Sequence, residues 1–127
     1  MSKPASANFI VPLVIYPYDV MVSVAETDEQ LRTRLKRYGL DKEDNLWMYS
    51  SANKTGKAVA FPGDQCLIRI KSLPKTPFDF GNLLHEIFHV ASFIMWKIGM
   101  KLKIKNNDEA YAYLIGYLTK VIYEKLL

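Results

Sequence analysis

The first half of the chain shows the two-residue alternation of apolar and polar positions that is typical of half-buried strands. Residues 9–16 are rich in β-branched and aromatic side chains, and residues 20–24 have valine at every second position. Two further β-rich runs, residues 57–61 and 65–71, are separated by residues 62–64, which read Pro-Gly-Asp and favour a turn. The pattern therefore predicts four short strands.

A helix is predicted between the second and third of these strands. Thr27 and Gln30 have the spacing of a capping box, in which two side chains satisfy free main-chain N–H groups at the start of a helix. Leu31 and Leu35 then continue an apolar stripe, and Gly39 is suited to end the helix.

The second half of the chain predicts two longer helices. Residues 83–98 are almost continuously apolar, and Gly99 follows as a helix stop. Because a helix that is apolar nearly all round is usually buried, we expect this one to lie inside the protein. A last helix is expected from residue 108 to about residue 126, with Asn107 as its N-cap.

These elements predict an α+β fold, with a small, twisted, mostly antiparallel sheet packed on about three helices. The length of 127 residues corresponds to one domain. We assign residues 9–127 to this domain and residues 1–8 to a loose N-terminal tail. Half of the residues are hydrophobic and 24% are charged, which is the balance of a folded protein rather than of a disordered one.

Charge and composition exclude several classes of protein. The formal charge of 17 − 13 = +4 does not by itself indicate nucleic-acid binding. A nucleic-acid partner would depend on the lysines of residues 97–105 and the basic face of residues 32–37, but no aromatic-basic motif accompanies them. One cysteine, Cys66, rules out an internal disulfide and a multi-cysteine zinc finger, and its alternation with Ile68 predicts a buried position. Without a membrane-length apolar run or a recognisable signal peptide, we expect a cytoplasmic protein with no membrane partner.

The chemical signal lies within the apolar helix, which reads His-Glu-Ile-Phe-His from His85 to His89. These two residues are the only histidines of the chain. Residues four apart lie on the same helix face, with about 6 Å of rise between them, so both imidazoles can bind one zinc ion. Glu86 is then placed to reach a water molecule on that ion. The alternative is a cluster of core histidines with Glu86 as an ion-pair partner, which buries three polar groups in an apolar helix.

A catalytic zinc site usually has three protein ligands and one open position, so a third ligand is needed. Glu109 lies in the first turn of the last predicted helix, 109 − 89 = 20 residues after the second histidine, and is the candidate that we favour. Asp108 and Cys66 are the alternatives for this position. A purely structural explanation of Glu109 is that its carboxylate complements the helix dipole.

The His-Glu-x-x-His motif followed by Glu109 at the start of the next helix resembles the arrangement of the gluzincin zinc metallopeptidases. The short chain is similar to minimal, single-domain members, including ImmA/IrrE-type and phage-encoded peptidases, which suggests a viral origin. The resemblance implies that His85, His89 and Glu109 bind zinc. It also implies that Glu86 is the general base and that residues 65–71 form the sheet edge along which a peptide substrate pairs.

Two departures from the family pattern concern groups other than the ligands. The resemblance covers about residues 57–122, and no further histidine is present to stabilise an oxyanion. Four residues after Glu109, where the family often has a carboxylate, the chain has Tyr113. Because a tyrosine hydroxyl can donate a hydrogen bond to an oxyanion, Tyr113 or Tyr111 is a candidate to replace the missing histidine, and packing in the core is the alternative explanation of both. From its place next to Glu109, Asp108 is a candidate to orient a zinc-bound histidine.

The sequence therefore predicts a zinc-dependent metallopeptidase that hydrolyses peptide bonds, with Zn²⁺ as cofactor and a peptide or protein as substrate. Glu86 would take a proton from water and pass it to the leaving amine. The alternative is a non-catalytic, zinc-stabilised module that uses the same ligands to bind a protein or to take its place in a larger assembly. We expect no nucleic-acid partner.

Overall fold

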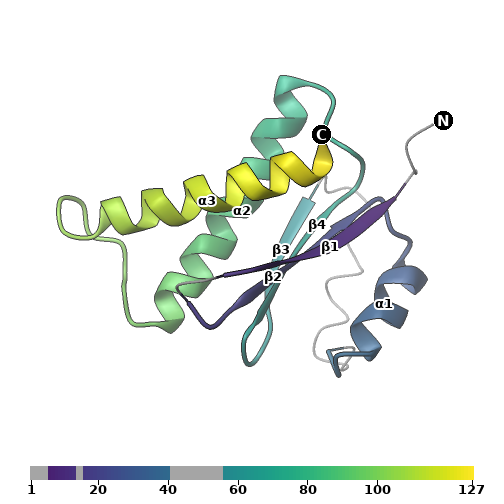
Figure 1. The fold of residues 1–127 in the computed structure, drawn as a ribbon, viewed down its shortest axis with the longest axis horizontal. Helices are drawn as coiled ribbons and strands as arrows, with labels where there is room; N and C mark the ends of the chain where they lie inside the picture. Colours follow the sequence, from purple (N-terminus) through teal and green to yellow (C-terminus); the bar gives the residue numbers. More distant parts are fainter. Residues whose placement is uncertain (1–5, 14–15, 41–55) are drawn as a thin grey trace.

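The computed structural model describes residues 6–13, 16–40 and 56–127. These ranges contain one sheet and three helices (Figure 1). The elements in chain order are β1 (Ala7–Pro12), β2 (Asp19–Val24), α1 (Asp28–Lys36), β3 (Gly56–Ala60), β4 (Gln65–Ile70), α2 (Pro77–Lys97) and α3 (Asp108–Leu126). None of the helices in the described ranges is long and apolar enough to cross a membrane.

The four strands form a mixed sheet with the order β1-β2-β4-β3. β1 pairs with β2, and β3 with β4, in antiparallel orientation, whereas β2 and β4 are parallel. The predicted α+β fold is therefore confirmed. The prediction that residues 65–71 form the sheet edge is wrong, because they form the interior strand β4 and β3 lies at the edge. Three consecutive residues of β4, 66–68, are fully buried, which is typical of a strand covered on both faces.

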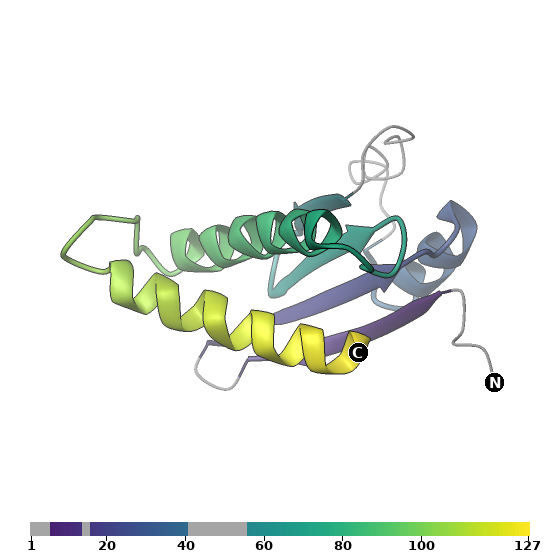
Figure 2. The ribbon, with the colours of Figure 1, turned by 90° about the horizontal axis from the view of Figure 1, so that it is seen from above.

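Helices cover both faces of this sheet. On one face, α2 lies over β3 and β4 and α3 lies next to β1 (Figure 2). The core on that face includes alternate residues of β2 and β4, namely Val20, Val22, Val24, Cys66, Ile68 and Ile70. A smaller core under α1, on the other face, contains Met21, Leu31, Leu35, Leu40, Val59, Phe61 and Leu67. The two-residue period of the central strands thus supplies both cores.

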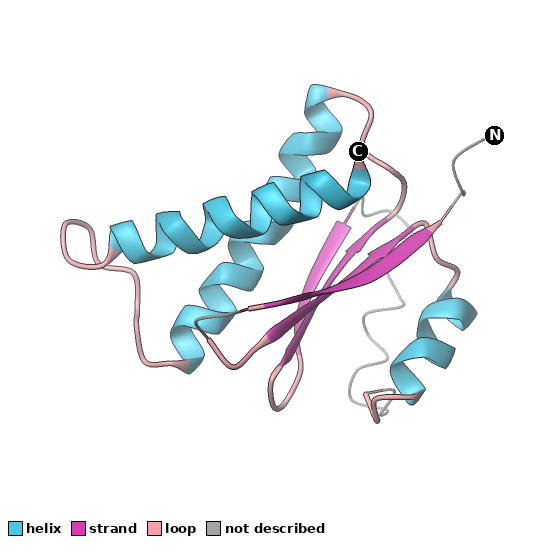
Figure 3. Ribbon diagram, in the orientation of Figure 1, coloured by secondary structure: helices cyan, strands magenta, loops and turns pink. Residues whose placement is uncertain are grey.

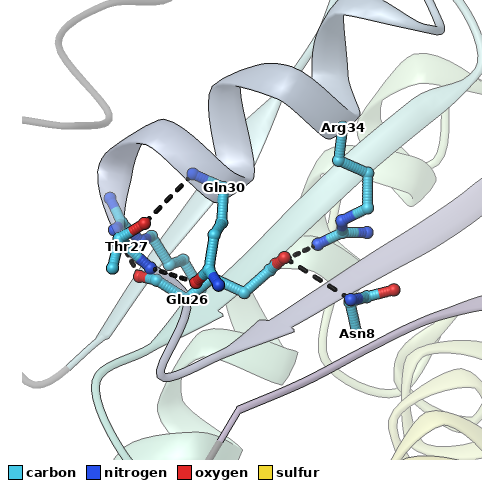
Figure 4. Close-up of polar contacts among 6 residues, drawn as sticks. Asn8, Glu26, Thr27, Gln30 and Arg34 are labelled. Carbon is cyan, nitrogen blue, oxygen red and sulfur yellow. Dashed lines mark hydrogen bonds and ion pairs between the residues drawn. The ribbon is translucent and has the colours of Figure 1, made fainter.

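An ion pair holds the start of α1 against the sheet. Thr27 and Gln30 form the predicted capping box, and Glu26 just before it pairs with Arg34 on the next turns of the helix (Figure 4). Asn8 of β1 donates a hydrogen bond of 3.5 Å to the second carboxylate oxygen of Glu26. The side chains of Glu26 and Arg34 are only 5% and 12% exposed, so solvent screens their attraction weakly.

α2 begins with a capping box that the apolar pattern did not indicate. Thr76 accepts a hydrogen bond from the N–H of Asp79, whose carboxylate in turn accepts one from the N–H of Thr76. Pro77 occupies the first turn, where a missing N–H is tolerated. The helix ends at Lys97, shortly before Gly99, which has a φ of +81° and ends the helix as predicted.

Burial of α2 is confined to one face, which corrects the expectation of a helix buried on nearly all sides. The buried residues are Leu83, Ile87, Val90, Ala91, Ile94 and Met95. The large apolar side chains that remain exposed are Phe78, Leu84, Phe88 and Trp96, at 42–73%. Within the described residues, the main contacts of this helix are with β3, β4 and α3. The apolar sequence of α2 therefore reflects an exposed apolar face as well as the core.

Lys97 fixes the direction in which α2 crosses the sheet. Its Nζ donates hydrogen bonds of 2.8 Å to the carbonyl oxygens of Phe61 and Gly63 in the turn between β3 and β4. Earlier in α2, Glu86 lies against Gly56 at the start of β3. α2 therefore runs along the edge strand in the same direction as the strand.

The start of β1 and the role of the Asn107 side chain differ from the sequence prediction. β1 begins at Ala7, so the last two residues of the expected tail belong to the sheet, while residues 1–5 lie outside the described residues. Asn107 occupies the N-cap position of α3 as predicted, but its side chain makes no capping bond. Instead it accepts a hydrogen bond from the N–H of Lys103 and donates one to the carbonyl of Lys101. Its role is to close the connection between α2 and α3.

Candidate metal centre

His85 and His89 lie one turn apart on the side of α2 that faces away from its buried stripe. His85 is exposed and His89 is half-buried. Their Nε2 atoms are 3.0 Å apart, and the rings meet edge to face with centroids separated by 4.7 Å. For this contact to be a hydrogen bond, one ring must carry its proton on Nε2 and the other must not. The four-residue spacing thus brings the same atom of both rings to one point, as the motif predicted.

The positions of the two nitrogens fit a zinc ion. Zn–N bonds of about 2.0–2.1 Å at a tetrahedral angle place two nitrogens about 3.3–3.4 Å apart. The observed 3.0 Å differs from this by an amount that small side-chain rotations can supply. With Glu86 included, one donor atom from each of the three residues lies within 4.8 Å of the other two. Two imidazoles and a carboxylate form a donor set that zinc accepts.

Glu86 lies on the side of α2 that faces the edge strand. A Cβ atom at Gly56 would be 3.1 Å from Cγ and 3.3 Å from Oε2 of Glu86, so glycine at this position leaves room for the carboxylate. Ala58 and Ala60 follow on the same face of β3 and are also small, which lets α2 lie close to the sheet edge. The half-buried carboxylate is therefore held between helix and strand, beside the histidines. Gly56 was not predicted as a site residue, although its alternation with two alanines was visible in the sequence.

Aromatic rings border His89. The ring of Phe93, four residues later, is nearly parallel to the imidazole with a centroid distance of 6.3 Å. Phe88 approaches it at 6.1 Å in a tilted arrangement. These contacts restrict the imidazole and shield part of it from water. In the sequence the two phenylalanines were indistinguishable from core residues of an apolar helix.

α3 runs antiparallel to α2. The hydroxyl of Tyr111, near the start of α3, donates a hydrogen bond to the carbonyl of Met100, just after α2. The hydroxyl of Tyr123, near the end of α3, donates one of 3.1 Å to the carbonyl of Phe80, near the start of α2. Tyr111 is therefore used in joining the two helices, and the start of α3 lies beyond the end of α2.

The structure does not bring Glu109, Asp108 or Tyr113 to the histidines. The part of α2 that follows His89 spans eight residues, or about 12 Å, and both carboxylates lie beyond it. They are exposed, and neither joins the His–Glu–His group within the described residues. Tyr113 is 77% exposed, on the side of α3 opposite its buried stripe. The spacing of 20 residues between His89 and Glu109 did not show that α2 continues to Lys97, so that α3 begins far from the motif.

Cys66 is also unavailable as a third ligand. It is fully buried in the core beneath α2 and α3, as its alternation with Ile68 predicted. Burial raises the pKa of its thiol to about 11, although the charge of Lys97 acts in the opposite direction. A thiol in this environment stays protonated at neutral pH and is a poor metal ligand.

The two basic segments of the chain do not form one surface. Residues 32–37 lie in and just after α1, whereas Lys101, Lys103 and Lys105 lie in the connection between α2 and α3. α1 and this connection are at opposite ends of the molecule (Figure 3). A single nucleic-acid strand therefore has no continuous basic track across these two segments.

No protein-family model matches the chain, and neither a curated protein nor a solved structure shows significant similarity to it. Within the part of the chain that the structure describes, His85, Glu86 and His89 form the group of side chains that could hold a metal ion.

Proposed function

We propose that the protein is a zinc-dependent hydrolase of the metallopeptidase type, with His85 and His89 as metal ligands and Glu86 as the general base. The observation that carries the proposal is the convergence of the two Nε2 atoms, 3.0 Å apart, with a carboxylate of the same helix turn beside them. The resemblance of the motif to that of gluzincins supports the same reading.

Each residue has a role that follows from its position. The histidines present two ring nitrogens to one point, and a zinc ion bound there would lower the pKa of a water ligand to about 7 and polarise a carbonyl group. Glu86 accepts the proton of the attacking water and donates it to the amine that leaves. Its half-buried position next to Gly56 keeps the carboxylate close to the site rather than extended into solvent.

The edge strand offers a way to hold a peptide substrate. Phe61 N–H bonds to the carbonyl of Gln65 at 3.1 Å, so alternate residues of β3 direct their main-chain groups away from β4. These outward-facing residues are Ala58 and Ala60. No strand of the described chain pairs with this side of β3. An extended peptide added here would run beside α2 and the histidines.

A second function is favoured by one specific observation. Among the described residues, Glu86 is the only group that joins the two histidines, so it is also the only nearby candidate for a third ligand. If Glu86 binds the metal, the described residues offer no other base, and the site is that of a zinc-stabilised binding module.

The variant Glu86→Gln separates the two functions. Zinc content and hydrolysis of a mixture of fluorogenic peptides are measured for the wild type and this variant. Glu124→Gln, which removes an exposed carboxylate of α3, is the matched control. For the hydrolase, the variant keeps its zinc and loses hydrolysis by at least about a hundredfold, while the control does neither. Loss of zinc in Glu86→Gln, with no hydrolysis in the wild type, would assign the binding module instead.

A further inference from the structure

Three large apolar side chains are exposed at the end of the molecule where α2 passes into α3. Trp96, in the last turn of α2, is 66% exposed, and Leu102 and Ile104 in the connection are 48% and 80% exposed. The connection projects beyond the sheet in both views of the ribbon (Figures 1 and 2). Exposed leucine and isoleucine at a convex tip are unfavourable in water and indicate a contact surface.

Lysines alternate with these apolar residues. Lys101, Lys103 and Lys105 flank Leu102 and Ile104, and all three are exposed. No acidic residue occurs between residues 87 and 107. The tip therefore combines an apolar centre with positive charge on either side, which is complementary to a surface that is apolar inside and negative at its boundary.

The tip has a defined conformation. The side chain of Asn107 accepts a hydrogen bond of 2.7 Å from the N–H of Lys103 and donates one of 2.6 Å to the carbonyl of Lys101. The hydroxyl of Tyr111 binds the carbonyl of Met100 at the start of the connection. These bonds keep the backbone in a shape that turns the apolar side chains outward rather than onto the core.

Within the tip, Trp96 and Met100 form part of the wall of an open hollow of about 410 Å³. Lys101 and Lys103 line the same hollow. An aromatic wall with two ammonium groups at its rim has room for a negatively charged head group next to an apolar chain.

We propose that this tip, formed by Trp96 and residues 100–105, docks on the surface of membranes that contain anionic lipids. Leu102 and Ile104 enter the boundary between head groups and acyl chains. Trp96 lies at the same level, where amphipathic aromatic rings are favoured. The lysines bind lipid phosphates. The expectation of no membrane partner rested on the lack of a membrane-length apolar run, and docking at the membrane surface needs no such run.

A membrane accounts for the tip better than other anionic partners. A nucleic acid would use the lysines but would gain nothing from exposed Leu102 and Ile104. An acidic protein would need a groove shaped to this convex tip, whereas a lipid surface adapts to it. The inference is independent of the proposed hydrolase, because no residue of the tip belongs to the His–Glu–His group.

The first turn of α3 limits the electrostatic part of the binding. Asp108 and Glu109 follow the lysines directly, so the three lysines and two carboxylates leave a local charge of 3 − 2 = +1. Removing the carboxylates should therefore strengthen binding to anionic vesicles. This gain is a consequence that a purely structural role of the connection does not have.

The test measures co-sedimentation of the full chain with vesicles of phosphatidylcholine alone and of equimolar phosphatidylcholine and phosphatidylserine. We expect binding to the anionic vesicles only, weakening as salt is raised. Replacing Lys101, Lys103 and Lys105 by Gln should reduce the affinity by about fivefold per lysine. The matched control changes Lys36, Arg37 and Lys75 to Gln, which removes the same charge elsewhere, and should have a smaller effect.

The apolar part is tested separately. Leu102→Ser and Ile104→Ser should each weaken binding roughly tenfold, whereas Phe78→Ser, at the other end of α2, should not. Asp108→Asn with Glu109→Gln should strengthen binding. Trp47 and Trp96 are the two tryptophans of the chain, so Trp47→Phe leaves Trp96 as the one source of tryptophan fluorescence. In this variant the emission of Trp96 should shift to shorter wavelength on addition of anionic vesicles.

Two results would overturn the proposal. One is the absence of binding to anionic vesicles at low salt. The other is binding that depends on the lysines but not on Leu102 and Ile104 and is matched by a soluble polyanion such as heparin, which would assign a polyanion site. His89→Ala should bind vesicles like the wild type, so failure of the zinc site and failure of this proposal are separate outcomes.

Discussion

Replacing Lys97 by Met should destabilise the protein, because this residue ties the end of α2 to the sheet. Its ammonium group donates two hydrogen bonds of 2.8 Å, to the carbonyls of Phe61 and Gly63. Hydrogen bonds of a charged group are worth about 1.5–3 kcal/mol when partly buried. The bond to Phe61 is partly buried, whereas the one to Gly63 is exposed and contributes less. We therefore expect a loss of about 2 kcal/mol in the free energy of unfolding.

Thermal unfolding measures this loss directly. At about 2.1 cal/mol/K per residue, the 127-residue chain has an unfolding entropy of about 270 cal/mol/K, so Tm should fall by about 7 °C. Lys120→Met, at an exposed position of α3, is the control and should change Tm by no more than about 2 °C. If Lys97→Met behaves like this control, the two bonds do not anchor α2, and the positioning of Glu86 over β3 needs another cause.

Three further predictions concern Gly56, Cys66 and Glu26. Gly56→Ala should displace the carboxylate of Glu86 and lower the rate of hydrolysis roughly tenfold, with unchanged zinc affinity. The control Gly81→Ala adds a methyl group in open space on α2, so it should leave activity unchanged and stabilise the fold by about 1 kcal/mol. Burial raises the pKa of the Cys66 thiol from 9.0 to about 11. Between these two pH values the unfolded chain binds fewer protons than the folded one, so the free energy of unfolding should fall as pH rises. Measured against pH, Tm should show this fall in the wild type and lack it in Cys66→Ala. Glu26→Gln should lower the free energy of unfolding in urea by about 3 kcal/mol, because its partner arginine stays largely buried without a counter-charge; a change below about 1 kcal/mol would show that the pair does not hold α1.

Local patterns in the sequence predicted the secondary structure well because each depends on neighbouring residues. The capping box of Thr27 and Gln30, the helix stop at Gly99 and the alternation that buries Cys66 were all confirmed. Sheet order was not predictable in this way. Alternation shows which residues share a face, but not which strands are neighbours, and the edge position of residues 65–71 that the family resemblance implied was wrong.

The candidate site was predictable only as far as it lies within one helix. His85, Glu86 and His89 are held together by helix geometry alone, and the structure groups them. Glu109 had to be placed by the length of α2 and the path of the connection after it, neither of which the motif specifies. The contribution of Gly56 required knowledge of which strand lies beside the helix.

The zinc content of the purified protein tests the central claim most directly. We predict about one zinc ion per chain, lost or weakened at least about a hundredfold in His85→Ala and in His89→Ala. Glu109→Ala should keep its zinc, because this residue lies beyond the end of α2. A wild type that takes up no zinc, or variants that keep it after loss of either histidine, would contradict the assignment of this helix face as a metal centre.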